Sequence, residues 1–552
     1  MTDMRKILTA IFALGLCLGT AAQNLNQTVS ISNTYLIGSE DEEKQYVPVA
    51  LPDSLTRFSY KFDYSVFETP YKGAFEFSPY SVRMIPDSSV PDSRALFVRA
   101  GAGYGLYPQL QAVWNPLHNG KFSLNVHQDF HGYAGNYRTV CKEQGENAML
   151  TFKDKRFRGY DFSENFGVRG KWNSEKFDAG FDVSYNGIFN KDDVFDGNRF
   201  NSVSAGAGIA SKYGSAGKFR YDVNLIAEYA VDALDHSFER VGPSQQSADL
   251  TVSVEPRVSR EFALQIDARL KFVNYSDAGD FAYTYLGYAL APHIALNPGP
   301  VDLKAGVRID GTDRLKIAPD VLASVVFLEK IRIFASVTGG TTFNSYTDMR
   351  RANHWFCPGY SESLRNTFEQ INASIGFEGG IASRLQYRLK GGFAMADDLP
   401  LWGVKAVSGK KLAPLLTFVG CRYAYADLSL VWRSPRFDAD GTLAFRKSNL
   451  NGSTSVFDMP LLSGNLRAAY NWNRRIFAGV KMNASMASQA ALGGVSMKLP
   501  AYVDLGVYGE YRINRRWSVW LEGGNLLNEA IQITPMHVEN GINGTIGIVF
   551  SL

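Results

Sequence analysis

Cysteine is scarce in this sequence, and its spacing excludes two common kinds of site. Of the 552 residues four are cysteine, and no two of them form a CxxC pair. A disulfide framework or a structural zinc site needs closer or more numerous cysteines than Cys141, Cys357 and Cys421 provide. A single bridge between Cys141 and Cys357 across two outer loops stays open as an alternative in an oxidising compartment.

A strong excess of charge is also missing, as are the short motifs of common enzymes. The formal net charge is +3, so the balance indicates no nucleic-acid partner. None of the seven histidines lies in a recognisable Ser-His-acid motif, and there is no phosphate loop or dinucleotide fingerprint. We therefore expect no catalytic residues, no cofactor and no enzymatic activity.

Long apolar runs are absent beyond the amino-terminal segment. Two basic residues, Arg5 and Lys6, precede an apolar run and a group of small residues. This arrangement is typical of a secretory signal peptide, so we expect residues 1–22 to be removed. Cys17 would allow a lipoprotein leader instead, but the large residue Leu16 precedes it. No later run of about 18 apolar residues could span a membrane as a helix, so a membrane protein of this sequence must be a barrel.

The sequence is rich in strict alternation of apolar and polar residues. In residues 261–272 apolar side chains occupy every second position from Phe262 to Phe272, and the positions between them hold Ala263, Gln265, Asp267, Arg269 and Lys271. The same period recurs in segments of about ten residues and ends on "GTIGIVFSL" at the carboxyl terminus. Arg, Lys, Asp and Glu recur on the polar face, which suits a solvated lumen and not a packed core.

Short and long connections alternate between these segments. Outer-membrane barrels have short periplasmic turns and longer outer loops, so the alternation predicts about twenty-two antiparallel strands with both ends in the periplasm. Longer connections are expected at residues 131–160, 341–369, 394–421, 448–460 and 525–541. We predict an all-β protein: a transmembrane antiparallel β-barrel over residues 95–552, preceded by an aromatic-rich arm over residues 23–94.

Tryptophan placement agrees with this orientation. Aromatic side chains favour the membrane interface, and several tryptophans lie on the apolar register beside a predicted short turn. We expect these residues to form an interface belt: Trp114, Trp172, Trp432, Trp472 and Trp517.

The carboxyl-terminal residues resemble those of a known group of barrels. Thr545, Gly547, Phe550 and Leu552 resemble the signal read by the barrel assembly machinery, with Leu in the last place where Phe is usual. The stretch "WLEGGNLLNEAIQ", residues 520–532, resembles the penultimate strand and outer loop of TonB-dependent receptors. The resemblance implies an outer-membrane location, with lipid and the assembly machinery as partners.

The amino-terminal part departs from that family. TonB-dependent receptors carry a plug domain before the barrel that is longer than residues 23–94, and no TonB box follows the leader here. The chain thus resembles a plugless, Bacteroidetes-like member of the group. The arm alternates aromatic and polar residues from Phe58 to Tyr64, which predicts either a periplasmic strand under the barrel or a constriction inside the lumen.

Polar residues on the inward register are candidates for a site. His127, Asp129 and His131 form a weak candidate for a metal site, because alternate strand residues lie nearly 7 Å apart, too far for one ion without a bend. Other charged residues are expected to line the lumen, either in cross-strand ion pairs or as a selective passage. They are Asp267, Arg269, Lys271, Asp302, Lys304, Arg308, Arg332, Arg388, Lys390, Arg467, Lys481, Asp504, Glu510 and Arg512.

Two functions from different classes fit these features. The first is a barrel that passes or gates a solute across the outer membrane without its own plug, with the loops around Trp355 and Trp402 as candidates for substrate or partner capture. The alternative is a scaffold that transports nothing and holds a lipoprotein or another periplasmic partner. A wide, plugless lumen would make the membrane leaky, so some other segment must fill it.

Overall fold

The computed structural model describes residues 95–552 with internal gaps. Residues 1–94, which include the expected leader and arm, lie outside the described residues, as does Cys357. The other gaps are residues 105, 143–149, 192–194, 213–218, 237–238, 260, 277–281, 313, 328–330, 359–362, 382–383, 409–410, 451–458, 493–494 and 534–536.

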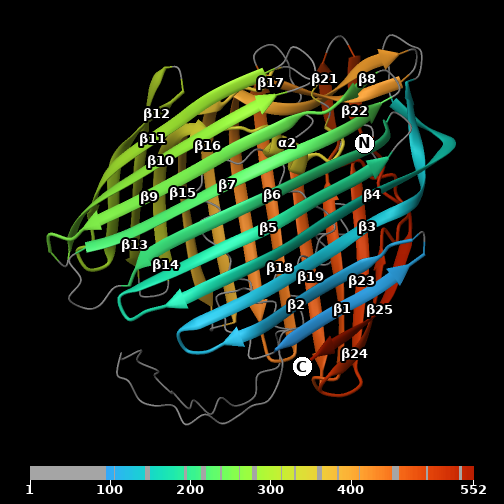
Figure 1. Cartoon of the computed structure of the whole chain (residues 1–552), viewed down its shortest axis with the longest axis horizontal. Helices are drawn as coiled ribbons and strands as arrows, with labels where there is room; N and C mark the ends of the chain where they lie inside the picture. Colours follow the sequence, from blue (N-terminus) through green and yellow to red (C-terminus); the bar gives the residue numbers. More distant parts are fainter. Residues whose placement is uncertain are drawn as a thin grey trace, which may run out of the picture. The chain divides into compact units, whose positions relative to one another are not determined.

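Twenty-two of the described strands form one closed antiparallel barrel (Figure 1). In chain order they are β1 (Leu96–Gly103), β2 (Gln109–His118), β3 (Phe122–Lys142), β4 (Leu150–Asn173), β5 (Phe177–Lys191), β6 (Phe195–Ser211), β7 (Phe219–His236), β9 (Ser244–Pro256), β10 (Phe262–Ser276), β11 (Ala282–Leu296), β12 (Val301–Gly311), β13 (Leu315–Phe327), β14 (Ile331–Thr342), β15 (Thr367–Ile381), β16 (Leu385–Ser408), β17 (Lys411–Arg433), β18 (Phe437–Leu450), β19 (Leu462–Trp472), β20 (Ile476–Ser485), β23 (Tyr502–Arg512), β24 (Trp517–Gly524) and β25 (Asn543–Ser551). The predicted fold class and strand number are confirmed.

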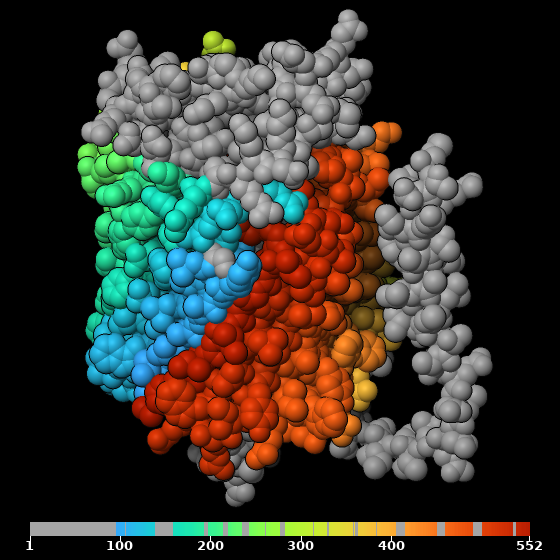
Figure 2. All heavy atoms as spheres, turned by 90° about the vertical axis from the view of Figure 1, so that its right-hand side faces the viewer, coloured from blue at the N-terminus to red at the C-terminus, as the bar shows by residue number. Residues whose placement is uncertain are grey.

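The first and last strands pair with each other, which closes the sheet. The register joins Phe97 to Ser551 and Gly103 to Thr545. Figure 2 shows β1, in blue, lying directly against the red carboxyl-terminal strands. Closure leaves the barrel without a free strand edge, so its backbone hydrogen bonds are satisfied within the sheet.

The exterior of the barrel is apolar, as the alternation predicts. In β25, Ile546 and Ile548 on the outward register expose 63% and 50% of their surface, whereas Val549 on the opposite register is buried. A closed barrel with an apolar outer band is a transmembrane barrel of the outer-membrane type, so the protein lies in the outer membrane.

Within the described residues, no helix has both the length and the apolar character that a membrane span requires. The predicted interface tryptophans are exposed on the barrel, and each lies at or near a strand terminus beside a short turn: Trp114, Trp172, Trp432, Trp472 and Trp517. Their role in an interfacial belt stays a prediction.

Two connections that the sequence predicts as long loops are extended hairpins instead. β3 and β4 stay paired as far as Lys142 and Leu150, and β16 and β17 as far as Ser408 and Lys411. Paired backbone groups need no other partner, so a hairpin can rise beyond the membrane without exposing unsatisfied amides. A short strand at the same end, β8 (Glu239–Val241), pairs with β7 beyond the barrel strands, and β21 (Ser488–Leu492) and β22 (Val495–Leu499) form a separate hairpin.

The seam between β1 and β25 depends on glycine. Gly101 and Gly547 face each other across the seam, and the indole of Trp520 covers both. A Cβ added at Gly547 would collide with the Ala100 carbonyl oxygen and lie 2.6 Å from ring atoms of Trp520. The guanidinium of Arg99 lies 4.0 Å from the centre of the same indole, which fixes the ring from the other side.

We expect Gly547→Val to prevent the seam from closing. Overpacking of this kind costs about 1–3 kcal/mol or more, and here the obstacle is backbone that cannot move aside. The measurement is heat-modifiable mobility on a detergent gel, where the variant should lose the compact, unheated band. Gly544→Val is the matched control, because the nearest atom to its added Cβ is 3.8 Å away. Equal mobility of the two variants would contradict this account of the seam.

Candidate functional site in the outer half of the lumen

The connection between β14 and β15 folds into the barrel instead of extending outward. It contains the helix α2 (Tyr346–Ala352), which lies among the outer ends of the strands (Figure 1). Ser345 caps the helix by accepting a hydrogen bond from the Asp348 amide, and Arg350 and Arg351 complement the dipole of the last turn. We call residues 343–366 the lid.

A buried ion pair fastens the lid to the wall. Arg350 Nε donates to Asp232 Oδ2 of β7 at 2.7 Å, and the Tyr346 hydroxyl donates to the same oxygen at 2.6 Å. Arg350 and Asp232 both have 0% exposed surface. The Tyr346 amide also donates to Gln245 Oε1 of β9 at 2.8 Å. We call Asp232, Tyr346 and Arg350 the latch.

A second anchor holds the beginning of the lid. Lys271 Nζ of β10 donates to the Phe343 carbonyl at 2.9 Å and to Asp348 Oδ2 at 3.0 Å. Burial opposes ionisation of Asp348, but Lys271 and the Ser345 hydroxyl outweigh it and hold the pKa of this carboxyl below its ordinary value. The anchored carboxylate therefore stays charged over the neutral pH range.

Apolar side chains complete the packing of the lid. Tyr346, Met349 and Phe356 of the lid belong to one buried cluster that also contains Phe200 of β6 and Trp402 of β16. The Phe356 and Trp402 rings meet edge to face, with centroids 5.4 Å apart. Polar and apolar contacts thus dock the lid against several strands of the wall. The sequence prediction that loops around Trp355 and Trp402 capture a substrate stays a prediction.

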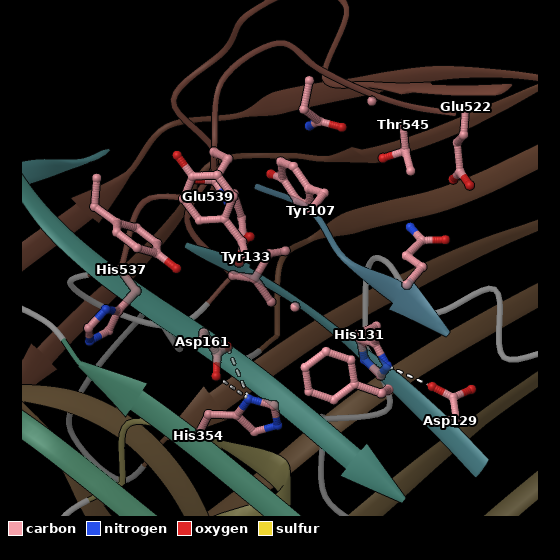
Figure 3. A pocket seen from close by; sticks show the side chains of 18 of the residues that line it. Tyr107, Asp129, His131, Tyr133, Asp161, His354, Glu522, His537, Glu539 and Thr545 are labelled. Atoms are coloured by element: carbon pink, nitrogen blue, oxygen red, sulfur yellow. Dashed lines mark hydrogen bonds and ion pairs between the residues drawn. The ribbon is translucent and has the colours of Figure 1, made fainter. Parts of the chain in front are cut away.

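A cavity of about 310 Å³ lies beside the lid, in the outer half of the lumen (Figure 3). Its lining comes from the wall strands β1 to β4, β20, β24 and β25, from the end of the lid, and from the described part of the connection between β24 and β25. We call it the outer cavity. Its lining combines polar, charged and aromatic side chains.

Aromatic rings form a continuous row along one side of the outer cavity. Tyr107 and Tyr133 have ring centroids 4.6 Å apart, and Tyr133 contacts Tyr137 at 5.2 Å. The ring centroids of Tyr137 and Trp355 of the lid are 6.5 Å apart. Trp355 stacks on His537 of the last connection, with a centroid distance of 3.9 Å and an angle of 6° between the ring planes. Burial lowers the pKa of His537 to about 3, so its imidazole is neutral and stacks as a flat ring.

The charged residues around the outer cavity are mostly paired. His131 Nδ1 lies 2.8 Å from Asp129 Oδ1, and His354 Nδ1 of the lid lies 3.0 Å from Asp161 Oδ1, as Figure 3 shows. Glu522 forms ion pairs with Lys481 and, at 3.7 Å, with Arg99. Asn190 of β5 also donates to the carbonyl of His354, which adds a further contact between the wall and the lid.

Glu539 differs from these carboxylates. Among the described residues no cation pairs with it, and its charged neighbours are the carboxylates of Asp161 and Asp504. Burial raises the pKa of Glu539 to about 8, and the two carboxylates add to the shift. The outer cavity therefore contains one acid that is protonated at neutral pH when the cavity holds no cation.

The structure separates the three residues of the candidate metal site. Asp129 and His131 lie together on the outer cavity, whereas the ring of His127 lies beside Gly167 of β4. Across the part of the chain that the structure describes, no three His, Cys, Asp or Glu side chains are placed to hold a metal ion.

The charged residues expected in the lumen form several groups. Lys481 and Asp504 lie near the outer cavity, and Lys271 anchors the lid. A second cavity, of about 440 Å³, lies toward the short-turn end and is lined by Asp302, Lys304, Arg332, Arg388 and Lys390.

Many of these charges form ion pairs between strands. Arg332 pairs with Glu378 at 3.4 Å and Arg388 with the same carboxylate at 3.6 Å. Three more pairs join different strands: Asp267 with Lys304, Arg269 with Asp249 and Arg467 with Asp440. Arg308 pairs with Asp310 within β12. The guanidinium carbon of Arg512 lies 5.1 Å from the centre of the Phe477 ring. Glu510, two residues earlier on β23, is half-buried. Whether the lining selects a solute stays a prediction.

Sequence reasoning missed the latch and Glu539. Asp232 and Gln245 occupy ordinary inward positions of β7 and β9, and nothing local to them points to residues about a hundred positions away. An available signal was the pair Arg350 and Arg351 inside an apolar, aromatic loop, because such charges need partners if the loop folds inward.

No protein-family model matches this sequence, and no curated protein matches it. Its fold, however, matches solved structures at a probability of 1.00. The structural neighbours are TonB-dependent receptors. The copper transporter OprC has a TM-score of 0.61 and 13% identity over 83% of this chain and 82% of that chain. The FrpB iron transporter from Neisseria meningitidis has a TM-score of 0.63 and 9% identity over 83% and 81%.

A ferric enterobactin receptor from Pseudomonas aeruginosa, PfeA, is similar to the same extent, with a TM-score of 0.60 and 11% identity over 83% of this chain and 80% of that chain. At identities this low the likeness shows the receptor-type barrel fold. The fold that the carboxyl-terminal resemblance implies is confirmed.

Proposed function

We propose that this protein passes a small solute across the outer membrane, with its lid as the gate and without a plug domain of its own. The observation that carries the proposal is the docked lid. A segment of the barrel's own chain is fastened to the wall inside the outer half of the lumen and borders a solute-sized cavity. The structural neighbours, two transporters and a receptor, support a role in transport.

The lid meets a physical requirement of such a barrel. Twenty-two strands enclose a lumen too wide for wall side chains to fill, so an unobstructed barrel would leak. A few polar contacts and one aromatic cluster fasten the lid to the wall, and contacts of this kind can break and form again. A permanent obstruction of the lumen could not open in this way. A solute that displaces the lid contacts at the outer cavity would open a path past them.

Single-channel recording in planar bilayers tests the proposal. We expect the full-length protein to be silent at rest, and a variant lacking residues 24–90 to stay silent, because the lid closes the lumen in both. Conductance that appears on deletion of residues 24–90 would make the arm the gate and contradict the lid. A stable lipoprotein that copurifies in mild detergent, with silence in every variant, would favour the scaffold.

A further inference from the structure

We propose that the outer cavity binds an organic cation, an ammonium group on a small carbon skeleton, between the Glu539 carboxylate and the faces of Tyr107 and Tyr133. The inference rests on the proposed function and names the class of its solute. It depends on the charge balance, the aromatic lining and the unfilled hydrogen-bonding positions of this one cavity.

The charge balance of the cavity favours a cation. The basic side chains that line the cavity already form ion pairs: Lys481 and Arg99 pair with Glu522, and Arg351 pairs with Glu228. Among the described residues nothing positive faces Glu539. An ionised Glu539 next to Asp161 and Asp504 would leave excess negative charge in a poorly solvated space, and a cationic ligand would remove that cost.

The aromatic lining suits the same ligand. Tyr107 and Tyr133 are half-buried and line the cavity, together with the buried rings of Tyr137 and Trp355. Figure 3 shows Tyr107, Tyr133 and Glu539 gathered on one side of the cavity, apart from the Asp129–His131 pair. An ammonium group over a tyrosine face is attracted by the ring quadrupole, and the attraction grows as the group loses water. A carboxylate beside two aromatic faces is thus an arrangement for a cation.

An unsatisfied acceptor lies next to Glu539. Asn540 lines the cavity, and its Oδ1 atom is buried with no hydrogen-bond partner among the described residues. A buried acceptor without a donor costs free energy, so a donor from a ligand is favoured there. An N–H of a primary ammonium supplies that donor, which a neutral apolar solute does not.

Titration calorimetry of the full-length protein with n-butylammonium tests the inference, with 1-butanol as the neutral probe of similar shape. We expect saturable binding of the ammonium and none of the alcohol. Glu539→Gln should weaken binding at least about tenfold, because it keeps the shape of the carboxyl and removes its charge. Tyr107→Phe should keep the affinity and Tyr107→Leu should reduce it, since the first change retains the aromatic face.

The pH dependence gives a second readout. The groups that face Glu539 are Asp161 of β4, Asp504 and Tyr502 of β23, Tyr107 and Tyr137, with His537 in its own segment. Because the free carboxyl is protonated below about pH 8, affinity should rise about tenfold per pH unit up to that value. Glu539→Gln should abolish the rise.

Equal binding of the ammonium by the wild type and Glu539→Gln, or equal binding of the alcohol, would overturn the inference. So would absence of any ammonium binding at pH 9 in protein that keeps its heat-modifiable mobility. These outcomes leave the proposed gate intact if release of the lid still opens a channel. Silence of every lid variant would instead sink the proposed function, whatever the calorimetry shows.

Discussion

Replacing Arg350 with methionine should turn a silent barrel into a conducting one. The change leaves the Asp232 carboxylate buried against the wall with the Tyr346 hydroxyl as its remaining latch partner. Loss of one partner of a buried ion pair costs about 3–5 kcal/mol. The barrel strands pair with one another independently of the lid, so undocking of the lid relieves this cost more readily than unfolding of the barrel. Planar-bilayer recording should show frequent openings.

Two matched variants separate the latch from a general loss of charge. Arg365 in the same lid pairs with Asp398 at 3.2 Å, but the two side chains expose 55% and 37% of their surface. An exposed pair contributes little, so Arg365→Met should stay silent. Addition of Asp232→Asn to Arg350→Met should restore closure, because the amide oxygen still accepts from Tyr346 and no buried charge remains. A silent Arg350→Met barrel would refute the latch.

Excision of the lid should give a larger and permanent conductance. The two ends of the lid are hydrogen-bonded to each other. Asn344 Nδ2 donates to the Arg365 carbonyl at 2.8 Å, and the backbone N–H of Asn344 donates to Asn366 Oδ1 at 3.0 Å. A short Gly-Ser linker can therefore replace residues 346–363 without straining β14 or β15. Removal of α2 and its aromatic cluster empties the outer half of the lumen, so we expect an open channel without closing events.

Cells that express the excised variant should also become sensitive to bulky hydrophilic antibiotics that the outer membrane normally excludes. The heat-modifiable mobility of the variant should match the wild type, since the β14–β15 register does not depend on the lid. A silent, fully folded excision variant would show that another segment closes the lumen. The β21–β22 hairpin, which contacts β16 and β4, is then the segment to remove next.

The barrel could be predicted from sequence because one physical rule acts at every position. A strand with lipid on one side and water on the other must alternate, so residues such as Leu264 and Asp267 fix both the strand and its register. The hairpin extensions beyond the membrane were not predicted, because above the bilayer both faces of a strand can be polar. Alternation in β3 beyond His131 weakens for that reason, although the pairing continues.

The lid and the outer cavity were less accessible to sequence reasoning. A seven-residue helix is too short to show an apolar stripe, and the direction in which a loop folds depends on partners elsewhere in the chain. Asp129 and His131 were recognised because they lie on a strand with a clear register. Glu539 was not, because it lies in a connection without any period, and its surroundings exist only when several separate segments meet.

The pairing of β1 with β25 sets the order of events during assembly. Phe97 and Ser551 lie at opposite ends of the described chain, so every hairpin between them can form before these two residues meet. The seam is thus the contact with the greatest sequence separation. Its formation carries the largest entropic cost of loop closure, so it should form last and slowly. Until then β1 presents an unpaired edge that could template aggregation in the periplasm. The rate-limiting step of folding should therefore be capture of the last strand, and a chain that ends before Asn543 should accumulate as an open sheet.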